Sequence, residues 1–400
     1  MLPTLGDFRR DQLATAALFF FLGFQYATWA SRLPALKSRF GLGETQLGLL
    51  LMICGVGAAV AFPLIAHLMR RLGSRRLALW SALGLVAVLP ALSAAGGYPL
   101  VLLVIFLDGV AVGCLNVAMN AQGAALESRH GRAAMAQLHA SFSAGSLGGA
   151  LLASGMNTVT HSLTAHFTVA AVLSVLLLAG ARTRLSADDP AAPGPGEEQA
   201  AQRKKGPGIL NGASRAAVVL GCAMVFGTVT EGAMNDWSAL YLTEETGASG
   251  QLAPLGIAVV SVMMVLARLV GDGWRNRWGD ARMVRVGSTV AGTGLALALL
   301  TGGTWPALIG FACVGLGMAT VTPCLYVAAA AQGPNALALV AAMGTTGLLA
   351  GPALIGFVAG YADLTVGMAV VAASAVLVAV CARWISWTER TSGASVASGA

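Results

Sequence analysis

Charge is scarce in this chain of 400 residues: Asp, Glu, Lys and Arg together make up 10%, against 56% hydrophobic residues. A soluble domain covers its surface with far more charge, so the composition argues against a soluble fold. The sequence also lacks a Gly-x-Ser-x-Gly elbow, a Gly-x-x-x-x-Gly-Lys phosphate loop and a His-Glu-x-x-His motif. These absences argue against an enzyme and against nucleotide-driven transport, and no cofactor is expected.

Cysteine offers no metal site. The six cysteines lie inside apolar stretches without the spacing of metal ligands, which predicts small packing residues. They are Cys54, Cys114, Cys222, Cys313, Cys324 and Cys381.

What the chain has in abundance is apolar sequence of membrane length, about 20 residues for each crossing. Twelve such stretches occur, at 12–31, 45–69, 77–95, 98–122, 133–154, 164–181, 215–241, 252–274, 283–302, 305–329, 336–359 and 363–386. The predicted fold class is an all-α membrane protein with twelve transmembrane helices in two pseudo-symmetric six-helix bundles. We expect the bundles at 1–184 and 214–387, a cytoplasmic linker at 185–213 and an unstructured tail at 388–400.

The distribution of Lys and Arg predicts the orientation. With the N-terminus inside, the cytoplasmic segments hold twenty of these bases and the outer segments only Arg32, Lys37 and Arg39. The positive-inside rule therefore predicts a multi-pass protein of a bacterial-type inner membrane with both termini in the cytoplasm. The net charge of +7 is spread over short loops, so it indicates orientation in the lipid bilayer and no nucleic-acid partner.

Two short basic turns mark a duplication. Arg71-Leu-Gly-Ser-Arg-Arg76 and Arg277-Trp-Gly-Asp-Ala-Arg282 start 206 residues apart, and each joins two apolar stretches. Trp29 in the first stretch aligns with Trp237 in the seventh. A repeated six-span unit is typical of secondary transporters.

At these turns the chain resembles the major facilitator superfamily, whose pattern there is roughly Gly-x-x-x-Asp-Arg-x-Gly-Arg-Arg. The resemblance covers essentially the whole chain and implies the twelve-helix transporter fold. The residues that match this gate motif are Arg71, Gly73, Arg75, Arg76, Arg277 and Gly279.

The same turns depart from the family pattern at both acidic positions. Arg70 and Asn276 stand where the family has Asp, a residue that the resemblance implies braces a closed cytoplasmic gate. Asp272, one turn earlier, is the first candidate to replace it. The segments 231–237, 116–120 and 139–143 resemble the branch of fucose-permease-like and uncharacterised bacterial inner-membrane permeases.

Ionisable groups deep in a span indicate function, because each costs roughly 2.5–3.5 kcal/mol on insertion scales. Glu231 and Asp108 are therefore the candidates for proton coupling; for Asp108, a packing role with a bond to Ser or Asn stays open. Asp236, nearer the outer interface, is expected to cap its helix or to pair with Arg32. Arg268 either pairs with Asp272 at i+4 or attracts an anionic substrate or a carboxylate, that of Glu231 or Asp108.

Uncharged polar and aromatic groups complete the candidate site. Trp29 and Trp237 are expected as interface anchors or, alternatively, as stacking surfaces for a sugar ring. The substrate-binding candidates are Gln25, Tyr26, Trp29, Asn116, Asn120, His139, Asn235 and Trp237.

The predicted function is alternating-access transport of a small organic solute, sugar-like or another metabolite. We expect a monomer that binds this small-molecule substrate and a coupling ion, H⁺. The alternatives are a drug or metabolite efflux antiporter and a non-transporting membrane sensor.

Overall fold

The computed structural model describes residues 5–186, 214–385 and 387, except for the side chains of Leu5 and Asp272. The regular secondary structure of this described part is helical throughout. The expected linker and tail lie almost wholly outside the described residues. The helices of the first half are α1 Leu5–Ala30, α2 Leu33–Phe40, α3 Glu44–Ala94, α4 Tyr98–His130, α5 Met135–Val159 and α6 Leu163–Ala181. Those of the second half are α8 Arg215–Glu244, α9 Leu255–Trp278, α10 Asp280–Thr301, α11 Thr304–Met318, α12 Val321–Ala331, α13 Pro334–Tyr361 and α14 Leu364–Cys381.

The basic turns reverse the chain through glycine. In α3 the backbone breaks at Gly73, whose φ of 75° and ψ of 168° are not helical, so α3 contains two crossings. Gly279 has a φ of 76° between α9 and α10 and makes the corresponding reversal in the second half. A side chain is unfavourable at such a positive φ, which explains why glycine stands at the equivalent place in both turns.

Within the described residues, twelve membrane-length segments result, as the sequence predicts, when α3 counts as two crossings and α11 with α12 as one. Nine helices of the described part meet a length and hydropathy criterion for spanning, including the double-length α3, and α9 contains a shorter apolar stretch, Leu255–Gly271. The predicted fold class is confirmed. We call the end of the molecule that holds α2 the α2 end, and the opposite end, with both basic turns, the turn end.

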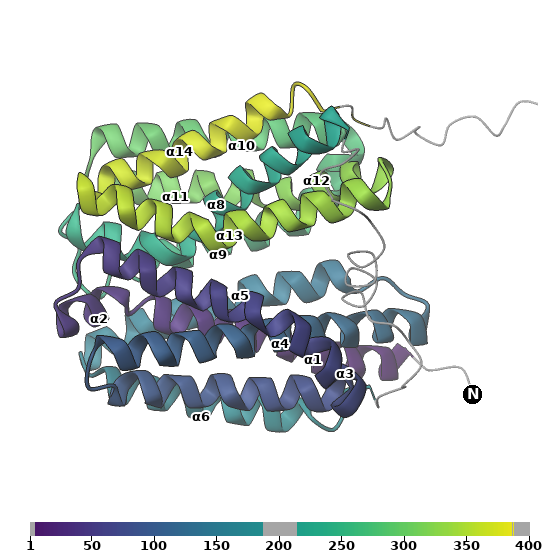
Figure 1. Cartoon of the computed structure of the whole chain (residues 1–400), viewed down its shortest axis with the longest axis horizontal. Helices are drawn as coiled ribbons and strands as arrows, with labels where there is room; N and C mark the ends of the chain where they lie inside the picture. The colour runs from purple at the N-terminus through teal and green to yellow at the C-terminus, as the bar shows by residue number, and fades with distance from the viewer. Residues whose placement is uncertain (1–4, 187–213, 386, 388–400) are drawn as a thin grey trace, which may run out of the picture.

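The two groups of six crossings lie one above the other, with α2 at the left in Figure 1. They pack against each other chiefly through α3 with α13 and α5 with α9. Glycine allows this close approach: a Cβ on Gly356 of α13 would lie 2.7 Å from the Cα of Gly48 on α3. The interface between the halves is therefore tight toward the α2 end, where both glycines lie.

Candidate functional site between the halves

In the second half of the protein, an acidic side chain of α8 and a basic side chain of α9 meet near the middle of these two helices. Arg268 Nη2 of α9 lies 3.7 Å from Glu231 Oε1 of α8, and the two side chains are 26% and 22% exposed. Arg268 Nη1 also donates a hydrogen bond of 2.5 Å to Ser143 Oγ on α5, which ties the pair to the first half. Of the partners expected for Arg268, the structure brings Glu231 to it, whereas the Asp272 side chain lies outside the described residues.

A broken helix completes the surroundings of Glu231. The tenth crossing is interrupted after Met318, and α12 restarts at Val321 with Pro323 in its first turn. Proline fits the first turn of a helix because it has no N–H to donate, and it disfavours continuation of the helix before it. Thr322 Oγ1 donates to Glu231 Oε2 at 3.1 Å, so the positive end of the α12 dipole lies beside the carboxylate. Sequence reasoning missed Thr322, although Thr-Pro inside a span was a signal for this break.

The second coupling candidate, Asp108, lies in a separate buried cluster. Gln25 Nε2 of α1 donates to Asp108 Oδ1 at 2.8 Å, and Cys54 Sγ lies 3.6 Å from Oδ2. Asp108 and Gln25 are both fully buried. The bond expected from Ser or Asn is thus made by Gln25 instead, and one of the cysteines treated as packing residues belongs to a polar contact. In this conformation Gln25 is engaged by Asp108.

The residue that follows Gln25 on α1, Tyr26, makes a polar contact that joins the two halves. Tyr26 donates a hydrogen bond to Asp236 Oδ1 of α8, and the Tyr26 ring packs edge-on to Trp29 at 5.2 Å. Asp236 is 3% exposed. The expectation that Asp236 pairs with Arg32 is wrong, because Arg32 Nη2 instead approaches the carbonyl oxygens of His161 and Ser162 at 3.5 and 3.4 Å.

The paired tryptophans are packing residues. Trp29 and Trp237 each have an exposed fraction of 0% and belong to the same apolar core. An interface anchor must reach the lipid headgroups and a stacking platform must reach the solute, so in this conformation neither expectation holds. Their alignment in the sequence reflects matching core positions in the two halves.

The remaining candidates divide by exposure. Asn116 on α4 and His139 on α5 are exposed, and Asn120 is half-buried with its Nδ2 on the Asn116 carbonyl oxygen at 2.7 Å. His139 lies edge-on to Phe19, with ring centroids 5.2 Å apart. Asn235 is partly buried, and its Nδ2 donates to the Glu231 carbonyl oxygen at 3.2 Å. Asn116, Asn120 and His139 lie toward the turn end, away from the packed α2 end.

The gate motif makes contacts within each half. Arg75 donates to the Arg182 carbonyl oxygen at 2.8 Å, while in the second half Arg275 Nε pairs with Asp280 Oδ1 at 2.9 Å. Arg71 and Arg277 are exposed. The Arg275–Asp280 pair is an acid–base contact of the second turn that sequence reasoning did not single out.

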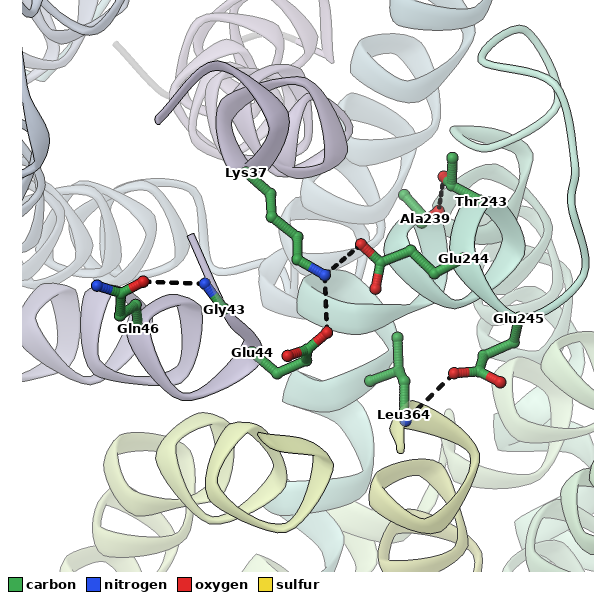
Figure 2. A network of polar contacts seen from close by, with 9 residues as sticks. All are labelled: Lys37, Gly43, Glu44, Gln46, Ala239, Thr243, Glu244, Glu245 and Leu364. Carbon is green, nitrogen blue, oxygen red and sulfur yellow. Dashed lines mark hydrogen bonds and ion pairs between the residues drawn. The ribbon is translucent and has the colours of Figure 1, made fainter. Parts of the chain in front are cut away.

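A charged network joins the halves at the α2 end, as Figure 2 shows. Lys37 of α2 reaches Glu44 of α3 at 2.7 Å and Glu244 of α8 at 2.5 Å. Close by, Asn157 and Ser154 of α5 donate to the carbonyl oxygens of Gly250 and Gln251, which precede α9. The structure is therefore fastened at the α2 end. These residues, most of them near helix ends, carried no motif, so sequence reasoning missed the network.

Comparisons with known proteins agree with this architecture. The sequence profile of the Major Facilitator Superfamily matches residues 13–336 and 228–399. The chain belongs to the major facilitator superfamily. It is 34% identical over 388 residues to an uncharacterized MFS-type transporter of Yersinia pestis, covering 94% of this chain and 96% of that one. It is 30% identical to the membrane protein MosC of Rhizobium meliloti over 370 residues, 92% of this chain and 88% of that one.

Solved structures show the same fold at low sequence identity. A variant of the nucleoside transporter NupG matches with a TM-score of 0.72 and 14% identity, over 94% of this chain and 99% of that one. The D-xylose-proton symporter matches with a TM-score of 0.72 and 15% identity, over 95% and 98%. FucP in its outward conformation matches with a TM-score of 0.62 and 16% identity, over 96% and 100%. The chain is a transporter of this superfamily by sequence and by fold.

Proposed function

We propose that this protein moves a small polar organic solute by alternating access, driven by protons. The observation that carries the proposal is the Glu231–Arg268 pair, partly exposed at mid-span and bonded through Ser143 to the opposite half. Ionisable groups at this depth are expensive unless they serve transport or are paired, and here the pair lies where the halves must separate.

The state captured supports alternating access. Hydrogen bonds and ion pairs fasten the halves at the α2 end, while Asn116 and His139 expose polar atoms toward the turn end. We infer from the bases that both termini lie in the cytoplasm of a bacterial-type inner membrane, so that the turn end faces inward and the proposed monomeric transporter is in an inward-facing form. Rocking of one half against the other would break the Lys37 network and open the site to the outer side.

The electrostatics of Glu231 support proton coupling. While Glu231 is ionised, Arg268 neutralises it and Thr322 donates to it. Protonation removes this attraction and frees the guanidinium to hold Ser143 or the solute more strongly, so the proton and the orientation of Arg268 are linked. Asp108 is the alternative carrier, but its bond to Gln25 places it within the first half only.

The solute class is supported by uncharged polar side chains on α4, α5 and α8, of which Asn235 bonds the Glu231 carbonyl oxygen. Asn116, Asn120, Asn235 and His139 offer amide and imidazole donors and acceptors without a net charge, which suits hydroxyl groups. The fold neighbours named as nucleoside and D-xylose transporters carry solutes of that kind. A sugar or a related polyhydroxylated metabolite therefore fits best.

The test is transport by the purified full chain in proteoliposomes. A thermal-shift screen of pentoses, hexoses, nucleosides and antibiotics first identifies a solute, because a ligand that binds the folded state stabilises it. Glu231→Gln should then abolish accumulation driven by a pH gradient while solute counterflow continues. The control Glu245→Gln, which alters a carboxylate bonded to Thr365 at the α2 end, should keep both. Undiminished proton-driven accumulation in Glu231→Gln would overturn the coupling assignment, and stabilisation by antibiotics alone would favour drug efflux.

A further inference from the structure

An apolar groove of about 330 Å³ opens on the second half at the turn end, between α9, α10 and α11. This volume lies within the roughly 300–1,000 Å³ range of ligand sites. One wall is formed by the stacked indoles of Trp274 and Trp278, with centroids 6.0 Å apart and planes at 25°. The floor is formed where α10 meets α11 through glycines: a Cβ on Gly287 would lie 2.3 Å from the Gly317 carbonyl oxygen. Because these two positions carry no side chain, α10 and α11 pack backbone to backbone beneath the groove.

The groove faces the bilayer and lies apart from the solute site. Val286 and Val290, which line it, are 54% and 37% exposed. The exposed stripe continues along α10 through Leu297 and Leu300 at helical spacing. An apolar face that runs the length of a membrane-crossing helix contacts acyl chains.

A cation lies at the mouth of this apolar hollow. Arg282, in the first turn of α10, lines the groove and is exposed. The neighbouring Arg275 is paired with Asp280, whereas Arg277 and Arg285 add exposed positive charge at the same end. The two tryptophans lie at this end too, where indoles favour the headgroup region. An apolar trough with an arginine at its headgroup end complements a lipid that carries negative charge.

We propose that this groove is a binding site for an anionic phospholipid of the cytoplasmic leaflet. Its acyl chain lies against Trp278 and Val286, and its phosphate pairs with the Arg282 guanidinium. The site rests on the orientation of the chain in the membrane and is independent of which solute is carried.

The test uses the full chain in nanodiscs that contain brominated phosphatidylglycerol or brominated phosphatidylcholine, because bromine quenches nearby indoles. The emission lost in Trp274→Phe and Trp278→Phe variants identifies the signal from the groove. Half of that signal should be quenched at a mole fraction of brominated phosphatidylglycerol about fivefold lower than the mole fraction of brominated phosphatidylcholine that has the same effect. This is the factor expected for one arginine near a charged headgroup. Arg282→Gln should remove this preference, whereas the control Arg285→Gln, exposed on the same helix but outside the groove lining, should keep it.

Several results would overturn the proposal. Equal quenching by the two lipids would show a general acyl contact without headgroup selection. An equal loss in Arg285→Gln would show diffuse attraction to the basic end. Relief of the quenching by millimolar inorganic phosphate would assign Arg282 to a free anion in place of a lipid.

Discussion

Tyr26 and Asp236 form a hydrogen bond that joins α1 of the first half to α8 of the second. Asp236 is 3% exposed, and the Tyr26 ring packs edge-on against Trp29. The contact lies between the mid-span Glu231–Arg268 pair and the Lys37 network at the α2 end. Opening the α2 end must therefore separate a buried carboxyl group from its donor.

Removing that donor should destabilise this state. Tyr26→Phe keeps the ring but leaves the Asp236 carboxyl group without its hydrogen bond, which costs about 1–3 kcal/mol. We expect a lower apparent Tm in detergent, measured by intrinsic fluorescence. Asp236→Asn keeps an acceptor oxygen for Tyr26 and should lower the Tm less.

A matched tyrosine controls for loss of a hydroxyl group. Tyr98 donates to the Gln46 carbonyl oxygen within the first half, at an exposed position. Tyr98→Phe should change the Tm by less than Tyr26→Phe does. Equal losses of stability in the two variants would show that the Tyr26–Asp236 hydrogen bond contributes no more than a hydrogen bond within one half.

The network at the α2 end should control access from outside. Lys37→Gln removes the cation that holds Glu44 and Glu244, and partly exposed ion pairs of this kind contribute about 1 kcal/mol or less. The population open at the α2 end should rise up to about fivefold. The measurement is labelling of Cys54, beside the Asp108 cluster, by an impermeant maleimide added to whole cells and read by peptide mass spectrometry.

Arg39→Gln is the control because Arg39 lies on the same helix but bonds the carbonyl oxygens of Ser93 and Ala95 within its own half. In Arg39→Gln, Cys54 should be labelled to the same extent as in the protein without substitutions. Unchanged labelling in Lys37→Gln would show that the network does not hold the α2 end closed.

The fold was predictable because its signals are local. Twelve apolar stretches, the count of bases on each side and the glycines in the two basic turns depend only on neighbouring sequence, and Gly73 and Gly279 reverse the chain as their positions indicate. The mid-span position of Glu231 could also be predicted, because its depth follows from counting residues along an apolar helix.

The partners were less predictable because they arise from contacts between distant helices. Nothing local to Arg268 favours Ser143 of α5 over Asp272 one turn away, and nothing in α1 indicates that Tyr26 meets Asp236. The tryptophans were misread for the same reason: an indole near a span end can face lipid or the opposite helix, and only packing decides.

Close packing of α3 against α13 should be necessary for closing the α2 end. Gly356→Val would place side-chain atoms against the Gly48 Cα and the Glu44 carbonyl oxygen, each 2.7 Å from the Cβ position. Overpacking costs about 1–3 kcal/mol, so the closed population should fall roughly tenfold and Cys54 labelling should rise. Gly155→Val on α5, where nothing lies within 4 Å of the Cβ position, should leave labelling unchanged. Equal labelling in both variants would count against this role.

If Glu231 and Arg268 neutralise each other, the stability changes caused by substituting each of them should not add up in the double variant. Arg268→Gln leaves the Glu231 carboxylate without its cation, and because the pair is about a quarter exposed the loss should stay below the roughly 3–5 kcal/mol of a fully buried pair. Glu231→Gln leaves Arg268 with Ser143 and should cost less. The double variant should recover part of the stability lost in Arg268→Gln, because the uncompensated charge is gone. Thermal unfolding of the four proteins gives the coupling energy, and strictly additive shifts would show that the two side chains do not interact.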